Sequence, residues 1–172
     1  MHRSKKVIIF SHCILNQNTV VNPLARAKGA YTSIVKKILD LDIGIHQLPC
    51  PEYLFLGLDR KPMGKEEYDS YEYRKVCRKI ACMSIKIIKE YINKGYEIVG
   101  MVGINCSPTC SIRGERGILM EELFKLLYEE KIDLRSFEIP ANYIEEGEKQ
   151  DILRAFDDFL NNMTRQSKFI FP

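Results

Sequence analysis

The chain has 172 residues, a hydrophobic fraction of 45%, a charged fraction of 28% and a formal net charge of +3. This length suits one domain, here residues 1–172, with a substantial core, and the composition is that of an ordinary globular protein. The small net charge, spread along the chain, gives no indication of nucleic-acid binding.

The first apolar run, VIIF, is much shorter than the roughly 7–15 residues of a secretory segment or the roughly 20 of a membrane span. We therefore expect a cytoplasmic protein without a membrane anchor. Six cysteines are too few for a disulfide scaffold of this length, and cytoplasmic disulfides are rare.

In chain order, short apolar runs alternate with helical stretches. Residues 6–12 (KVIIFSH) predict a buried strand, because the run is short, β-branched and without alternation. A helix is expected within residues 22–41, with four apolar positions at helical spacing: Ile34, Val35, Ile38 and Leu41. Residues 43–49 predict a second strand, which a proline ends, and residues 51–71 an ordered crossover loop that has room for a turn of helix.

The second half of the chain continues this alternation. Residues 71–95 predict the clearest helix, with a buried stripe of Val76, Ile80, Met83 and Ile87 and with Gly95 following its end. A third strand is expected at residues 96–105 and a fourth at 136–140. Two further helices are expected at residues 117–131 and 151–163, with these positions inward: Leu119, Leu123, Leu126, Leu127, Ile152, Phe156, Phe159 and Leu160.

Strands separated by helices predict an α/β fold, a single three-layer domain with a Rossmann-like open parallel sheet of about four strands and helices on both faces. Ligands of such sheets bind beyond the carboxyl ends of the strands. Cys13, Cys50 and the pair Cys106 and Cys110 follow the first three predicted strands, so three loops bring thiols to one edge. A metal site is the main interpretation, and buried cysteines that act as small apolar residues are the alternative.

The other two cysteines, Cys77 and Cys82, lie within the long helix and project roughly 140° apart. We interpret them as packing residues. His12, although next to Cys13, is expected to point away from it, because neighbouring side chains alternate along a strand.

Thiolates alone suit zinc or iron–sulfur chemistry. Three segments that carry these cysteines, SHCILN, PCPEYLFLGLDRKP and CSPTCS, resemble the signatures of the DUF523 family of thiouracil desulfidases. The resemblance covers residues from about 6 to 117. It implies a [4Fe–4S] cluster on Cys13, Cys50 and Cys110 and the non-redox removal of sulfur from a small thiolated heterocycle.

The resemblance also places the family's catalytic acid at Glu52 and its active-site serine at Ser107. Moving protons requires a partly desolvated carboxyl group at Glu52, whereas an ordinary loop glutamate would cap a turn. Ser107 either binds substrate or a cluster sulfide, or caps the backbone of a Ser-Pro turn. Asn16 is a candidate for substrate binding because an amide both donates and accepts hydrogen bonds, and its alternative role is a helix cap.

The sequence is also compatible with two other interpretations of the cysteines. Cys106 is either a fourth ligand or a free thiol that accepts sulfur. With four cysteines, the chain would be a structural zinc-binding protein or an iron–sulfur electron-transfer or carrier protein. The sequence leaves the protein as either a monomer or a homodimer.

Overall fold

The computed structural model describes residues 2–161. Its centre is a four-stranded, all-parallel sheet in the order β2-β1-β3-β4, as the sequence predicts for a Rossmann-like fold. The strands are β1 (Lys6–Phe10), β2 (Gly44–Gln47), β3 (Glu97–Ile104) and β4 (Ser136–Ile139).

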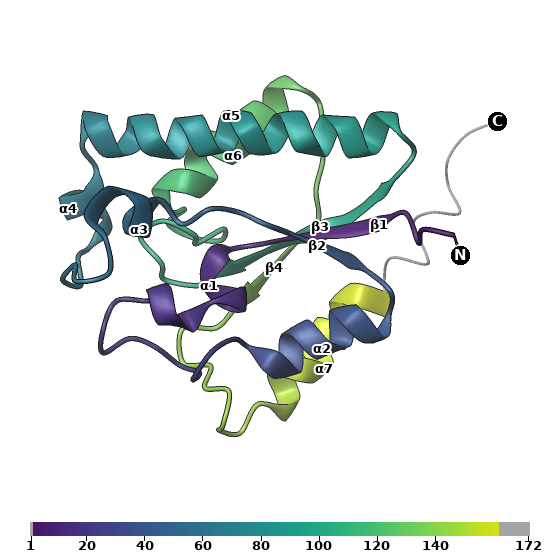
Figure 1. Ribbon diagram of the computed structural model, residues 1–172, viewed down its shortest axis with the longest axis horizontal. Coiled ribbons are helices and arrows are strands. Elements are labelled where there is room, and N and C mark those ends of the chain that lie inside the picture. The colour runs from purple at the N-terminus through teal and green to yellow at the C-terminus, as the bar shows by residue number, and fades with distance from the viewer. Residues whose placement is uncertain (1, 162–172) are drawn as a thin grey trace.

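Long helices cover both faces of the sheet and make it the middle of three layers (Figure 1). On one face lie α5 (Tyr71–Asn93) and α6 (Ile118–Glu129), and on the other lie α2 (Thr32–Asp40) and α7 (Gln150–Asn161). Strand β1 supplies both cores: Ile9 packs on the α5 and α6 side, and Ile8 and Phe10 pack on the α2 and α7 side. This two-sided burial explains its unbroken apolar run.

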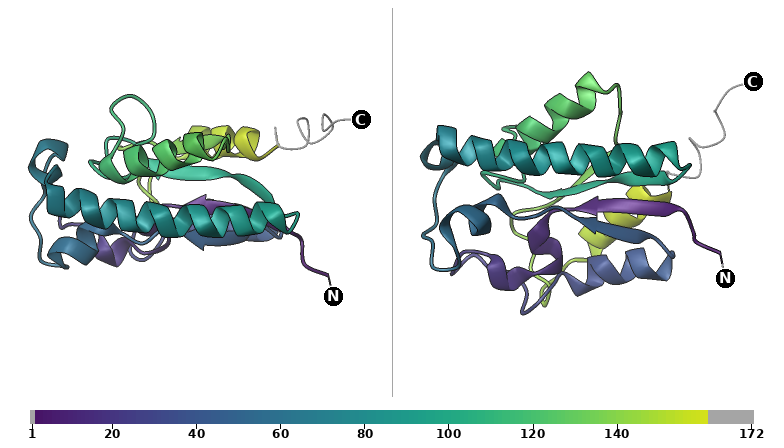
Figure 2. Two further views of the ribbon diagram at one scale, coloured as in Figure 1. Left: turned by 90° about the horizontal axis from the view of Figure 1, so that it is seen from above. Right: turned by 45° about the horizontal axis from the view of Figure 1, so that its top comes forward.

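The strand order reverses direction between β1 and β3. From β1 the chain crosses to β2 on one side, and from β3 it crosses to β4 on the other, so the loops after β1 and β3 border the crevice where such sheets bind ligands. Short elements gather at this carboxyl edge and extend beyond the sheet (Figure 2). They are α1 (His12–Leu15), the 3-10 helix η1 (Gln17–Thr19), α3 (Pro51–Leu56) and α4 (Lys65–Tyr68).

The buried face of α5 differs from the predicted stripe. Ile80 is buried and Val76 partly buried, but Met83 and Ile87 are 52% and 37% exposed. The face that packs on the sheet consists of Tyr73, Cys77, Ile80, Ala81, Ser84, Ile85 and Ile88. The prediction was wrong because small residues, Ala81 and Ser84, lie at the contact, while larger apolar residues one position away remain outside.

Most other predicted helix positions are confirmed. Gly95 follows α5 with a φ of 72°, a conformation that favours glycine at this point. Leu41 is instead 48% exposed because α2 ends at Asp40. Strand β1 ends at Phe10, two residues earlier than predicted, because His12 begins α1. The last two residues of the final predicted helix, 162 and 163, lie outside the described residues.

None of the helices within residues 2–161 combines the length and apolar composition that crossing a bilayer requires.

Two adjacent isoleucines test the orientation of α5. Ile88 is fully buried, so Ile88→Ala should lower the free energy of unfolding by about 2–5 kcal/mol through lost burial and a residual cavity. Ile87→Ala is the matched control and should cost less than about 1 kcal/mol. Urea denaturation measures both, and equal losses would contradict this orientation.

Candidate functional site

A cavity of about 150 Å³ lies at the carboxyl edge of the sheet. This volume is comparable to cavities that hold a benzene ring. Its walls include the thiols of Cys13, Cys50 and Cys110, which come from the loops after β1, β2 and β3. The apolar part of the wall consists of Val20, Val21, Leu24, Pro62, Met63, Ile104, Pro108 and Ala141. The fold therefore brings three cysteines that are distant in sequence to one partly open, largely apolar cavity.

Each of the three cysteines is held by its own local structure. Cys13 lies in α1, and its carbonyl accepts a hydrogen bond from Gln17 Nε2 at 2.7 Å. Cys50 is the N-cap of α3, where its sulfur accepts the Tyr53 N–H at 3.5 Å. Cys110 is buried after β3, and its carbonyl accepts the Ile104 N–H at 3.3 Å. The backbone thus fixes all three positions.

Burial dominates the electrostatics of these thiols. It raises the pKa of Cys13 to about 12, with further contributions from Cys50 and Glu52. Burial likewise raises the pKa of Cys50, and it raises that of Cys110 well above the usual value, with Cys13 and Cys50 adding to the effect. The three sulfurs are thus close enough to oppose one another's ionisation, and a bound cation would favour their thiolate forms.

A single metal ion does not match the present spacing of these groups. Within residues 2–161, no three His, Cys, Asp or Glu side chains converge closely enough to hold one ion.

Glu52 lies next to the thiols in the first turn of α3, with its side chain 14% exposed. Its Oε2 accepts hydrogen bonds from Arg60 Nε at 3.3 Å and from the Tyr68 hydroxyl at 3.4 Å. Burial, together with the Glu52 charge, raises the pKa of Tyr68 to about 12, so this hydroxyl remains a donor at neutral pH. The carboxyl group of Glu52 is partly desolvated and both of these contacts are on Oε2, while its catalytic role stays a prediction.

Arg60 orients Glu52 from a buried position, with only 3% of its side chain exposed. Its two terminal nitrogens donate to the carbonyls of Gly57 at 3.0 Å and Thr19 at 2.7 Å. The guanidinium therefore connects the loop after β1 to the loop after β2, while Nε fixes the carboxylate between them.

Ser107 lines the cavity, and its hydroxyl oxygen caps the turn that it begins. Ser107 Oγ accepts the N–H groups of Thr109 at 3.3 Å and Cys110 at 3.0 Å. The turn interpretation is therefore confirmed. The hydroxyl still has its own proton to donate, and its role in binding or catalysis stays a prediction.

Asn16 is not among the residues that line the cavity. Its Oδ1 caps η1 by accepting from the backbone and side-chain nitrogens of Asn18, at 3.1 and 3.2 Å. Gln17, which is 2% exposed, lines the cavity in place of its neighbour Asn16, as does the amide residue Asn105. The capping alternative for Asn16 is confirmed, and substrate binding by Asn16 stays a prediction.

Cys106 differs from the other three cysteines at this edge. It is exposed, adopts a positive φ of 60°, and directs its S–H to Asn105 Oδ1 at 3.0 Å. It lines both the cavity and a hollow beside it that Lys65 and Arg113 border. Cys106 is thus at the rim, whereas the other three thiols are inside.

Glu138, in the middle of β4, anchors the loop that carries Ser107 and Cys110. Its Oε1 accepts from Ser111 Oγ and from the backbone N–H groups of residues 112 and 113, and its Oε2 accepts from Asn105 Nδ2 at 3.1 Å. Burial by itself raises the pKa of Glu138, but these hydrogen bonds outweigh it and hold the pKa below its usual value. The carboxylate therefore stabilises the loop while it is ionised.

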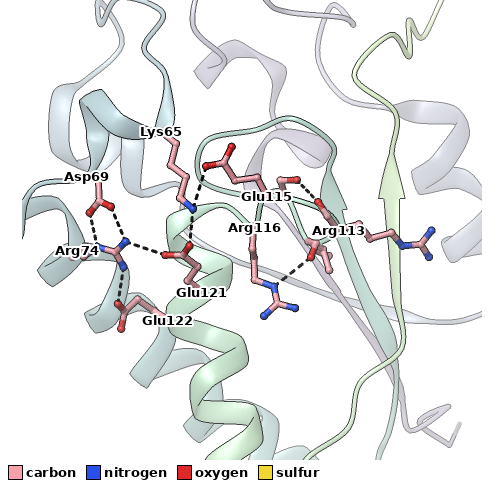
Figure 3. Close-up of polar contacts among 10 residues, drawn as sticks. Lys65, Asp69, Arg74, Arg113, Glu115, Arg116, Glu121 and Glu122 are labelled. Carbon is pink, nitrogen blue, oxygen red and sulfur yellow. Dashed lines mark hydrogen bonds and ion pairs between the residues drawn. The ribbon is translucent and has the colours of Figure 1, made fainter.

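A network of ion pairs fixes α4, which covers one side of the cavity (Figure 3). Lys65 contacts Glu121 of α6 at 2.6 Å, and the same carboxylate contacts Arg74 of α5 at 3.0 Å. Arg74 also pairs with Asp69 and Glu122. Because α4 ends at Tyr68, these contacts determine where the Glu52 donor lies.

Sequence reasoning missed several residues of the site. His12 was predicted to point away, but it begins α1 and lines the cavity. Arg26, Arg60 and Tyr68 also line it, and nothing in their local sequence distinguishes them from surface residues. Glu138 had a usable signal, because it is a lone charge in a short apolar strand.

The fold and the site define an α/β protein whose parallel strands end at a thiol-lined cavity. The profile of the family described as "Putative 2-thiouracil desulfurase" matches residues 5–132, and the chain belongs to this family. An uncharacterized protein of Methanocaldococcus jannaschii is 46% identical over 140 residues, which are 81% of this chain and 89% of the relative. No solved structure matches the chain significantly.

The contribution of Glu138 can be measured with Glu138→Gln. The amide has one acceptor oxygen in place of two, so the free energy of unfolding at neutral pH should fall by about 1–3 kcal/mol. Because the folded pKa is lowered, this contribution is complete above the ordinary glutamate pKa of about 4.3 and is lost as pH falls through the folded value. The difference from wild type should therefore shrink in acid.

Glu115→Gln is the matched control, because its side chain is 79% exposed and makes only a 3.7 Å contact with Lys65. It should change the unfolding free energy by less than about 0.5 kcal/mol. A Glu138→Gln protein as stable as this control at neutral pH would contradict the anchoring role.

Proposed function

We propose that this protein is an iron–sulfur-dependent desulfidase that removes sulfur, as hydrosulfide, from a small thiolated heterocycle such as thiouracil. The observation that carries the proposal is the convergence of Cys13, Cys50, Cys110 and Glu52 on one cavity. Membership in the putative 2-thiouracil desulfurase family supports the reaction class. A reducing compartment such as the cytoplasm suits these free thiols.

The residues present fit a [4Fe–4S] cluster. Three thiols from three loops, Cys110 buried and Cys13 and Cys50 half-buried, provide the soft ligands that such clusters need, and three cysteines would leave one iron open for substrate. When bound, the cluster would supply a Lewis-acidic, thiophilic iron that polarises a C=S bond. The guanidinium groups of Arg26 and Arg60 lie on the same walls and would offset the negative charge of the thiolates.

The reaction is a hydrolysis with no net redox change: water supplies the oxygen of the new C=O bond, and the C=S bond breaks to release hydrosulfide. Glu52 would take a proton from the attacking water on Oε1, because Oε2 already accepts from Arg60 and Tyr68. The proton would then pass to the leaving sulfur or to solvent. Arg60 and Tyr68 would hold the carboxylate at a fixed distance throughout.

The cavity walls would orient and desolvate the substrate. Apolar side chains exclude water from a space the size of one small ring, and the Ser107 hydroxyl has a proton to donate to a ring or to sulfur. The exposed Cys106 takes no part in this reaction, because the sulfur leaves as hydrosulfide, and the three cysteines within the cavity are the ligand set that we propose.

Metal content distinguishes the cluster proposal from the zinc alternative. If the cluster proposal holds, protein purified anaerobically should contain about four irons and about four acid-labile sulfides per chain, with a broad brown absorption band. Cys13→Ser, Cys50→Ser and Cys110→Ser should each lose most of this iron. Cys82→Ser is the matched control, because Cys82 lies on α5 away from the cavity, and it should retain the cluster.

One tightly bound zinc and no iron would contradict the desulfidase proposal and favour a structural metal site. A cluster retained in Cys110→Ser but lost in Cys106→Ser would instead assign Cys106 as a ligand.

The proton-transfer role is tested by Glu52→Gln. The variant should keep its iron, and sulfide release from 2-thiouracil should fall by about 10²–10⁴-fold because no carboxylate remains to move the proton. Glu66→Gln, at an exposed position on α4, should release sulfide at the wild-type rate. Full activity of an iron-loaded Glu52→Gln protein would remove the assignment.

A further inference from the structure

Ser11 has a buried hydroxyl that no neighbour satisfies. The residue lies between β1 and α1, is fully buried, and its Oγ has no hydrogen-bond partner among residues 2–161. Buried hydroxyl groups are nearly always paired in folded proteins, so an unpaired one calls for an explanation.

The Ser11 hydroxyl does not make the hydrogen bond that its position at the start of a helix would allow. Ser11 is the N-cap of α1, a position where a serine hydroxyl normally accepts a backbone N–H of the first turn, yet it makes no such bond. Its backbone is fully engaged, because Ser11 N–H donates to Val102 and its carbonyl accepts from Ile14, each at 3.1 Å. The hydroxyl therefore leaves the capping role unused although the backbone around it is fixed.

Ser11 lies next to the segment that carries Cys110, because Gly103 of β3 approaches the Cys110 carbonyl so closely that a Cβ there would lie 2.5 Å from its oxygen. Ser11 pairs with Val102 of β3, and the Cys110 carbonyl pairs with Ile104 two residues further along the same strand. Ile9, two residues before Ser11, and Cys110 both belong to the core on the α5 and α6 side, so alternation along the chain points Ser11 to the face where Cys110 lies. A neutral thiol is a weak acceptor, whereas a thiolate is a strong one.

We propose that Ser11 is a positioning residue for the metal centre: its hydroxyl donates a hydrogen bond to the Cys110 thiolate when that sulfur binds iron. The inference rests on the proposed cluster but concerns a residue outside its ligand set. Metal binding turns Cys110 into an acceptor and so completes the hydrogen bonding of Ser11. A donor to a ligating sulfur stabilises the more negatively charged, reduced cluster and so raises its reduction potential.

The test compares the cluster in wild-type protein, Ser11→Ala and Ser11→Thr, reconstituted anaerobically. In Ser11→Ala, the reduction potential should shift to a more negative value. The Fe–S(Cys) Raman bands should also lose the D₂O-induced shift that an exchangeable donor produces. Ser11→Thr keeps the hydroxyl and should restore the shift. Ser84→Ala, which deletes a buried serine hydroxyl of α5 outside the cavity wall, is the matched control and should match wild type.

The outcomes separate this inference from the proposed function. Iron-free wild-type protein overturns both. A wild-type cluster, with potential and D₂O shift unchanged in Ser11→Ala, overturns only the role of Ser11. An equal change in reduction potential in Ser84→Ala also overturns the role of Ser11, because the loss of any buried serine hydroxyl would then have the same effect. Cluster loss in Ser11→Ala, with retention in Ser11→Thr and with native circular dichroism in both, supports it.

Discussion

The parallel direction of all four strands is the constraint on which the site depends. Because every strand runs the same way, every strand ends at the same edge, and loops far apart in the sequence meet there. The reversal of strand order between β1 and β3 opens the crevice that the cavity occupies. An antiparallel sheet in the same strand order would have sent Cys13 to the edge opposite Cys50 and Cys110.

A second constraint follows from the burial of the thiols. Three sulfurs in an apolar cavity oppose one another's ionisation. The polar groups around them would offset the negative charge of the thiolates. Arg60 and Arg26 bring positive charge to the walls, and Ser11 brings a hydroxyl without a described partner. The carboxylate of Glu52 is fixed by two donors and stands next to the sulfurs.

Supports outside the cavity maintain this geometry. Glu138 anchors the Ser107–Cys110 turn from the far strand, and the shared hydrogen bond between Tyr73 and Thr109, at 2.7 Å, ties the same turn to α5. Gly117 allows the turn to approach α6, because a Cβ there would lie 2.3 Å from the Thr109 carbonyl carbon. Lys65, Arg74 and Glu121 hold α4 at the opposite side.

The sequence by itself determined the parallel α/β fold, the four strands and the edge to which three cysteines come, because apolar runs and helical spacing are local properties of the chain. It also separated the helical Cys77 and Cys82 from the others. The tertiary structure decided which face of α5 is buried, that Asn16 caps η1 while Gln17 lines the cavity, and that Arg60 and Tyr68 line the same cavity as the thiols. These features depend on contacts between segments that are distant in sequence. Ala81 is buried because of the residues that pack against it, and Arg60 reaches the site only because the fold brings Glu52 and Thr19 next to it.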